Sequence, residues 1–79
     1  MPIAFVFLTI EMGSEAEVLK ILKKVEGVVE VFAVFGVYDV ITKVRADSMD
    51  KLKEIVSEGI RRIGNVRSTL TMLVIDESK

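Results

Sequence analysis

The chain has 79 residues, of which 51% are hydrophobic and 29% charged, and its formal net charge is −1. It contains no cysteine and no histidine, which excludes disulfides, thiolate metal sites and histidine acid–base catalysis. A nearly neutral chain is a poor candidate for binding a phosphate backbone, and its apolar runs are too short to span a bilayer. We therefore expect one globular domain over residues 1–79, in the cytoplasm, with no cofactor, metal, direct nucleic-acid or membrane partner.

The first third of the chain predicts a strand followed by a helix. Residues 3–10 (IAFVFLTI) are apolar on both alternating faces, which is typical of a strand inside a sheet that is covered on both sides. Residues 14–25 predict a helix, because apolar side chains recur at helical spacing. Ser14 and Glu17 match a capping box, in which each side chain satisfies a backbone amide of the first turn.

The middle of the chain predicts two strands joined by a tight reversal. Residues 28–35 (VVEVFAVF) carry one charge, Glu30, which is typical of an edge strand or of a strand that faces a partner chain. We call residues 36–39 the hinge, because they reverse the chain before a third strand at residues 40–46. A reversal this short makes the two strands antiparallel neighbours.

The last part of the chain repeats this plan. Residues 48–63 predict a second helix, and residues 66–75 predict a fourth strand. Gly59 lies in the apolar stripe of that helix, where it lowers helix stability by about 0.5–1 kcal/mol relative to alanine. We expect close approach of the helix to the sheet to offset this loss. The order βαβ–βαβ with right-handed crossovers predicts a ferredoxin-like α+β fold, a four-stranded antiparallel sheet with two helices on one face.

One face of the predicted sheet has no helix to cover it. The first two strands and the end of the fourth are apolar on both faces, yet monomers rarely leave an apolar patch above a few hundred Å² in water. Burial of such a face gains about 25 cal/mol per Å². The sequence therefore predicts a homodimer in which two chains bury these faces against each other.

The hinge, made of Gly36, Val37, Tyr38 and Asp39, has two interpretations. As a structural turn, Gly36 supplies a positive φ and Asp39 hydrogen-bonds the local backbone. As a ligand loop, exposed amides near Gly36 hold a carboxylate and Asp39 holds an ammonium group. The residues taken alone favour the turn.

Thr69 and Thr71 share one face of the fourth strand. Ordinary strand propensity explains them, and the functional alternative is a pair of hydroxyls that point at a polar ligand. A solvated helix end similarly explains the nearby Arg61, Arg62 and Arg67. An RNA-binding sheet is disfavoured, because the third strand lacks the aromatic residues that stack on bases.

The hinge and the fourth strand also carry a family resemblance. The motifs Gly-x-Tyr-Asp at residues 36–39 and Val-x-x-Thr-x-Thr at residues 66–71 occur in the right order on the right elements. Together with the pattern of residues 4–6, 17–18 and 28–34, they resemble the effector-binding domain of the Lrp/AsnC feast/famine regulators, also called the RAM domain. The resemblance covers essentially the whole chain.

This resemblance implies a ferredoxin-like fold whose sheet faces pair into a dimeric α/β barrel, with dimers assembling further, often into octamers. It also implies that an amino acid effector binds between dimers, near the hinge. Residues 36–39 then become ligand-loop positions, with Thr69 and Thr71 as weaker ones. Because the chain has no histidine or cysteine and no cluster of acidic residues at ligand spacing, we expect no catalytic residue and no metal site.

The chain departs from the family in one respect. Its first strand begins directly after Met1, without the helix-turn-helix domain that the regulators carry. We therefore expect an amino-acid-sensing and oligomerisation domain that modulates regulation without binding DNA, and that mixes with full-length Lrp/AsnC regulators. The alternatives are a small dimeric enzyme, of isomerase or cofactor-free monooxygenase type, and a ligand-free assembly module. The enzyme is disfavoured, because such enzymes usually rely on His, Tyr or Asn, whereas this chain has no histidine and only one tyrosine.

Overall fold

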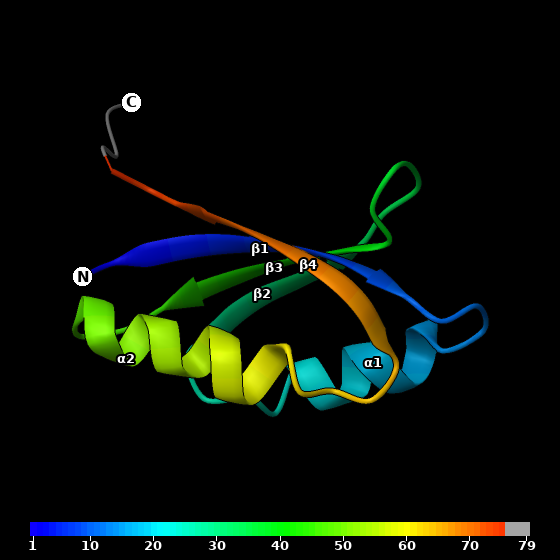
Figure 1. Cartoon of the computed structure of the whole chain (residues 1–79), viewed down its shortest axis with the longest axis horizontal. Coiled ribbons are helices and arrows are strands. Elements are labelled where there is room, and N and C mark those ends of the chain that lie inside the picture. Colours follow the sequence, from blue (N-terminus) through cyan, green and yellow to red (C-terminus); the bar gives the residue numbers. More distant parts are fainter. Residues whose placement is uncertain (76–79) are drawn as a thin grey trace.

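The fold contains four strands and two helices in the predicted order. The computed structural model describes residues 1–75, and the remaining residues 76–79 of the predicted domain lie outside the described part. The elements are β1 (Ile3–Ile10), α1 (Glu15–Leu22), β2 (Val28–Ala33), β3 (Val40–Arg45), α2 (Met49–Glu54), the π-helical segment η1 (Ile55–Ile60) and β4 (Val66–Leu73). The four strands form one layer above the helices in Figure 1. All neighbouring strands are antiparallel, in the order β2-β3-β1-β4. The ferredoxin-like prediction is confirmed.

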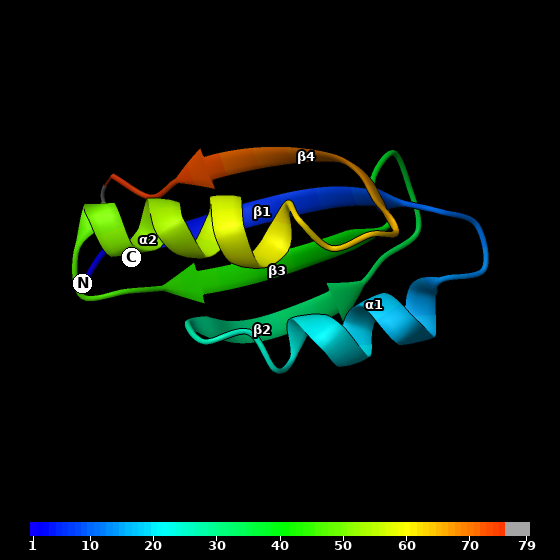
Figure 2. The same cartoon turned by 60° about the horizontal axis from the view of Figure 1, so that its bottom comes forward.

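Both helices lie on the same face of the sheet. Figure 2 shows α2 and η1 as one continuous helix over β1 and β3, while α1 lies along β2 and β4 forms the opposite edge. None of the helices in residues 1–75 is long and apolar enough to cross a membrane. The face away from the helices is left open.

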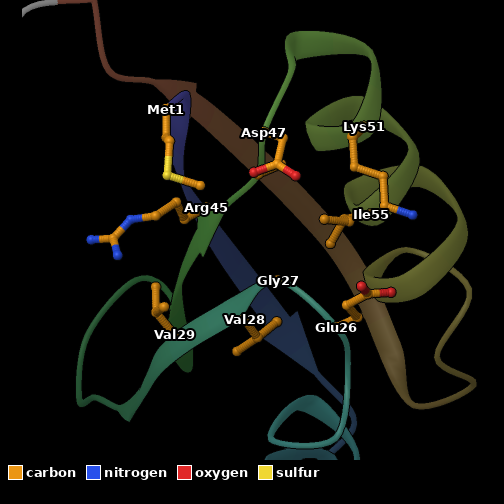
Figure 3. A pocket seen from close by; sticks show the side chains of 10 residues that line it. Met1, Glu26, Gly27, Val28, Val29, Arg45, Asp47, Lys51 and Ile55 are labelled. Atoms are coloured by element: carbon orange, nitrogen blue, oxygen red, sulfur yellow. The ribbon is translucent and has the colours of Figure 1, made fainter.

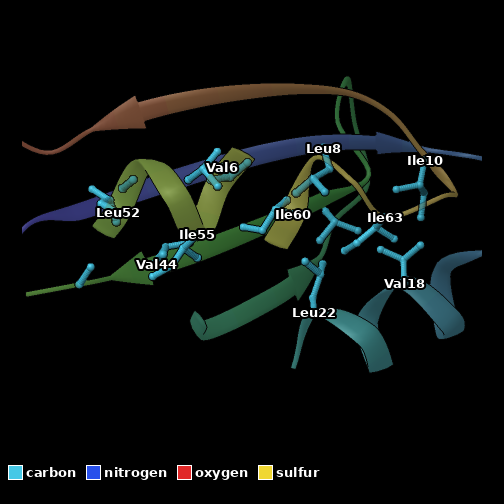
Figure 4. Close-up of a cluster of buried hydrophobic side chains, with 14 residues drawn as sticks. Val6, Leu8, Ile10, Val18, Leu22, Val44, Leu52, Ile55, Ile60 and Ile63 are labelled. Atoms are coloured by element: carbon cyan, nitrogen blue, oxygen red, sulfur yellow. The ribbon is translucent and has the colours of Figure 1, made fainter. Parts of the chain in front are cut away.

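The core lies between the sheet and the helices (Figure 4). β1 and β3 turn alternate side chains toward the helices, as the two-residue period of a strand requires, and the helices return their apolar stripes. The buried cluster consists of Ala4, Val6, Leu8, Ile10, Val18, Leu22, Val40, Val44, Ala46, Leu52, Ile55, Val56, Ile60 and Ile63. Full burial of one such large aliphatic side chain contributes about 1.5–3 kcal/mol.

Several elements are shorter than predicted. β1 occupies the predicted residues 3–10, whereas β2 ends at Ala33, β3 at Arg45 and β4 at Leu73. α1 ends at Leu22, because the next amides form the tighter i→i+3 bonds that are common in a last helical turn. These differences leave the order and the pairing of the strands unchanged.

The predicted capping box at the start of α1 is wrong. The Ser14 hydroxyl donates to the Glu11 carbonyl at 2.6 Å instead of accepting from the helix, and the Glu17 carboxylate accepts from the Asn65 amide at 3.4 Å. Ser14 has φ −101° and ψ 8°, away from the extended region that an N-cap normally adopts. Ser48 before α2 is extended, and its hydroxyl accepts from the Lys51 amide at 3.1 Å.

The second helix departs from α-helical geometry in η1. The Arg61 amide donates to the Val56 carbonyl at 2.9 Å, an i→i+5 bond that places an extra residue in the turn. Gly59 lies in this segment, and a Cβ there would lie 2.9 Å from Cγ1 of Val25. Gly59 therefore permits close approach to the segment that follows α1, whereas the sequence predicted close approach to the sheet.

Thr42→Val is expected to raise the free energy of unfolding by about 1 kcal/mol. Thr42 is fully buried, and its Oγ1 has no hydrogen-bond partner within residues 1–75. Valine replaces the unpaired hydroxyl with a methyl group of similar shape. Urea unfolding of both proteins at one concentration measures the difference, and Thr42→Ser, which keeps the hydroxyl and loses a methyl, should be less stable. A lower unfolding midpoint for Thr42→Val would contradict this interpretation.

Candidate functional site

The hinge lies in the connection between β2 and β3. This connection rises on the side of the sheet opposite the helices (Figure 1). Its base is closed by a bond from the Val34 amide to the Asp39 carbonyl, at 2.9 Å. Gly36 does not have a positive φ, since Gly13 and Gly27 are the only residues of the described chain that do. The prediction that Gly36 serves as a left-handed turn residue is therefore wrong.

Asp39 fastens the hinge to the end of β1. Its amide donates to the Leu8 carbonyl at 2.9 Å, and its Oδ2 accepts from the Ile10 amide at 2.9 Å. Ile10 lies at a register shift in the pairing of β1 with β4, between Thr9 and Ile10. The predicted local bond is thus replaced by a contact with a distant strand. Within residues 1–75, Oδ1 of Asp39 has no hydrogen bond and remains available to a ligand.

Tyr38 lies on the open side of the sheet. Its ring meets the ring of Phe7 edge to face, with centroids 5.5 Å apart, an arrangement that aromatic pairs favour. Beside it the loop is apolar and uncovered, because Phe35, just before the hinge, is fully exposed and Val37 is 87% exposed. Large apolar side chains held in water at a loop tip are typical of a contact surface.

The open face of the sheet carries two rows of side chains that cross all four strands. Register places Phe32, Ile41, Phe7 and Leu70 side by side in the first row. We call these four residues the apolar row. It remains partly exposed in the single chain, with Phe32 at 48% and Leu70 at 41%. A partly exposed apolar row of this kind is typical of a surface that contacts another chain.

The second row on the open face runs parallel to the first. It consists of Glu30, Lys43, Phe5 and Met72. Lys43 Nζ lies 3.8 Å from the carboxylate of Glu30, so the charges of this row pair with each other at the β2 edge. The edge position that Glu30 predicted for its strand is confirmed.

Thr69 and Thr71 lie on the helix side of the sheet, away from Tyr38. They pair with Leu8 and Val6 of β1, which are buried beneath the helices. Both threonines line a groove of about 540 Å³ between β4 and the second helix. None of the hinge residues lines this groove. Within one chain, the two parts of the predicted site are therefore on opposite faces.

The groove also contains residues that sequence reasoning did not assign to a site. Its lining consists of Lys53, Val56, Ser57, Arg61, Thr69, Thr71 and Leu73. We call it the basic groove. Arg61 was predicted to belong to a solvated helix end, and it is indeed exposed at the end of η1. It also lines the same groove as the two threonines. The 3.6-residue period of an ideal helix contained no signal for this placement.

A second cavity, of about 290 Å³, lies at the end of β2 and β3 that is remote from the hinge. Figure 3 shows Glu26, Asp47 and Met1, from three different segments, around it. Gly27 forms part of its wall with φ +94°. The cavity mixes charges of both signs, since Arg45 and Lys51 also line it.

Asp39→Ala is expected to destabilise the fold by about 1–2 kcal/mol, because the Ile10 amide loses its acceptor. Asp39→Asn keeps an oxygen at that place and should stay within about 0.5 kcal/mol of the original protein. Urea unfolding of the three proteins at equal concentration provides the comparison. Equal stabilities of the alanine and asparagine variants would show that the contact with β1 contributes nothing.

Comparison with known proteins identifies a family that this chain matches. Residues 3–79 match the family described as the Lrp/AsnC ligand binding domain. The HTH-type transcriptional regulator FL11 of Pyrococcus abyssi is 32% identical over 77 residues, which are 98% of this chain and 50% of that protein. Homocitrate synthase of Saccharolobus solfataricus is 43% identical over 54 residues, 68% of this chain and 12% of the enzyme. The chain thus spans half or less of the length of these relatives.

Solved structures agree with this match. FFRP-DM1 superposes with a TM-score of 0.90 at 35% identity, and the match covers 95% of this chain and 100% of that one. A transcriptional regulator of Neisseria meningitidis, NMB0573, solved as a complex with L-Met, has the same fold with a TM-score of 0.85 at 20% identity. That match covers 99% of this chain and 52% of the regulator.

Proposed function

The chain belongs to the Lrp/AsnC ligand-binding domain family, and from that membership we propose that it is an amino-acid-sensing assembly domain that modulates regulation without itself contacting DNA. The observation that carries the proposal is the position of the hinge. It rises on the open side of the sheet, beside the uncovered apolar row (Figure 1). A ligand bound at the hinge would therefore lie where a second chain packs.

The first part of the proposal is a dimer formed through the open faces. Phe32 and Leu70 stay substantially exposed in the single chain, and the apolar row continues across the sheet between them. Apposition of two such faces closes a dimeric α/β barrel and removes the row from water, at about 25 cal/mol per Å² of apolar surface. Such dimers then assemble into higher oligomers, of which an octamer is the expected form.

The second part is an amino acid ligand. Asp39 has one carboxylate oxygen free for an ammonium group, and amides of the exposed hinge can receive a carboxylate. Thr69 and Thr71 cannot join the hinge within one chain, because they lie on the helix side. A ligand that contacts both sets would bridge two chains. The L-Met complex of NMB0573, a protein of the same fold, supports this class of ligand.

The third part is a regulatory role in place of catalysis. The segment shared with homocitrate synthase is 12% of that enzyme, the size of one small accessory domain. FL11, named as a transcriptional regulator, is matched over half its length. We propose that this chain exchanges into the assemblies of such regulators. Native mass spectrometry of the chain mixed with a full-length relative would reveal mixed oligomers, and two unmixed populations would reject the exchange.

Calorimetric titration with each of the twenty amino acids tests the sensing function. We expect heat from at least one amino acid, and a loss of roughly 10-fold or more in its affinity for Asp39→Asn, because that variant removes the charge and keeps the fold. Thermal unfolding of the same samples provides a second readout, since bound ligand stabilises the folded state. No heat and no thermal shift with any amino acid would leave only an assembly module.

A further inference from the structure

The basic groove has the form of a ligand site with one sign of charge. β4 forms one wall with the hydroxyls of Thr69 and Thr71, and the second helix forms the other with Lys53, Ser57 and Arg61. Val56 and Leu73 add apolar surface. A concave volume with a few convergent polar groups is the usual form of a small-molecule site. No carboxylate belongs to this lining.

The π-helical turn brings the two cations of the groove into line. Lys53 and Arg61 are eight positions apart, so in an ideal α-helix they would be turned about 80° from each other around the axis. The i→i+5 bond from the Arg61 amide to the Val56 carbonyl takes one further residue into the turn, which removes roughly 100° of rotation. Both side chains therefore face the same groove, and π-turns of this kind are frequent at functional sites.

The charges of these two cations are not neutralised within the described residues 1–75. Within residues 1–75, neither Lys53 nor Arg61 lies within ion-pair distance of a carboxylate, whereas four other cations do. Two acidic residues of the same helix are engaged elsewhere, because Glu54 pairs with Lys51 and Glu58 pairs with Arg62. The residues that form these two ion pairs do not line the groove.

The threonine hydroxyls of the groove are also available. The Ser57 hydroxyl is not, because it donates its proton to the Lys53 carbonyl at 2.9 Å. Thr69 and Thr71 have no side-chain hydrogen bond in the described part of the chain. Two cations and two hydroxyl donors on facing walls match a planar anion, which accepts several charge-assisted hydrogen bonds at once.

We propose that the basic groove binds a carboxylate, and that the effector is an acidic amino acid whose side-chain carboxylate lies between Lys53 and Arg61 while Thr69 and Thr71 donate to it. This inference rests on the proposed sensing function and adds a ligand class to it. An amide side chain carries no charge to satisfy the two cations, and a lysine or arginine ligand would be repelled. The groove would therefore select L-aspartate or L-glutamate over L-asparagine, L-glutamine and basic amino acids.

Calorimetric titration of the full chain with L-aspartate, L-glutamate, L-asparagine, L-glutamine, L-leucine, L-lysine and succinate tests this assignment. We expect the acidic amino acids to bind at least about 10-fold more tightly than their amides. Lys53→Met and Arg61→Met should each weaken that binding by roughly 10-fold and reduce the preference. Arg62→Met is the matched control, because Arg62 follows Arg61 but pairs with Glu58 outside the groove, and its affinity should be unchanged.

The outcomes separate this inference from the sensing function. If a neutral or basic amino acid binds most tightly and neither Lys53→Met nor Arg61→Met weakens it, the carboxylate site is rejected and sensing stands. If succinate binds with the same dependence on both cations while no amino acid binds, the anion site stands and amino-acid sensing is rejected. If nothing binds, both are rejected. Circular dichroism of each variant establishes that it is folded before the titrations are compared.

Discussion

Phe7→Glu is expected to convert the assembly into monomers. Phe7 lies inside the apolar row, between Ile41 and Leu70, and a second chain on the open face would enclose it. A carboxylate buried there without a partner costs several kcal/mol, and a two-fold symmetric dimer contains it twice. The dissociation constant should rise by more than about 10⁴-fold. Sedimentation equilibrium at low micromolar concentration measures the change.

Two further variants keep this prediction specific. Leu70→Glu places the charge in the same row at a position that is 41% exposed in the single chain, so the folded monomer tolerates it and the dimer should still dissociate. Met12→Glu makes a similar apolar-to-acidic change at a side chain that is 98% exposed and outside the sheet, and it should assemble as the original protein does. If Phe7→Glu and Leu70→Glu both keep the original molecular mass, the open face is not the interface.

Gly27→Ala is expected to lower the free energy of unfolding by about 2–4 kcal/mol. Gly27 has φ +94°, and an added Cβ would clash with Cδ1 of Ile55 and lie 3.1 Å from the Arg45 carbonyl oxygen. The glycine cannot move away easily, because the Arg45 amide donates to its carbonyl at 2.8 Å. Urea unfolding at fixed protein concentration gives the value, which would be a large part of the 5–15 kcal/mol that stabilises a typical domain.

Alanine substitutions at two other glycines separate the effect of the positive φ from the effect of the steric clash. Gly13 has φ +83° with no atom near its Cβ position, so Gly13→Ala should show the backbone contribution alone, about 1 kcal/mol. Gly64 has neither a positive φ nor a near neighbour, and Gly64→Ala should stay within about 0.5 kcal/mol. A Gly27→Ala variant no less stable than Gly13→Ala would show that Ile55 yields without cost.

Most of the fold could be predicted, because it depends on local patterns. The two-residue alternation of β1 and β3 and the apolar stripes of the helices identify their elements, and the short hinge makes β2 and β3 antiparallel neighbours. The open face follows from the topology, because both helices lie on one side of the sheet and leave the other side uncovered. These features require only the periods of strands and helices.

The features that could not be predicted depend on contacts between distant segments. Asp is a residue type that is common in local turns, so the sequence suggests a local role for Asp39. Only the folded sheet brings the Ile10 amide to its carboxylate. The extra residue in the turn before Arg61 shifts the helical phase, which no 3.6-residue template anticipates. Ser14 does not have the extended backbone of an N-cap residue, and its hydroxyl donates to the Glu11 carbonyl.

The reversal at the hinge could be predicted, whereas its role in binding an effector between dimers stays a prediction. In the structure the hinge rises on the open side of the sheet. The placement of Thr69 and Thr71 on the face opposite the hinge could not be predicted without the register of β4 against β1. That register pairs Thr69 with the buried Leu8. A shift of one residue would have turned both hydroxyls to the open face, and the sequence of a single strand does not contain its register.

The most direct test of the account is a crystal structure of the assembly grown with the amino acid that gives the largest heat. We expect the apolar row of one chain to pack on the open face of a second chain. We also expect the ligand's ammonium group to lie within hydrogen-bond distance of Oδ1 of Asp39, at a junction of chains. An assembly in which the open face remains in solvent, or whose hinge touches neither ligand nor neighbouring chain, would contradict it.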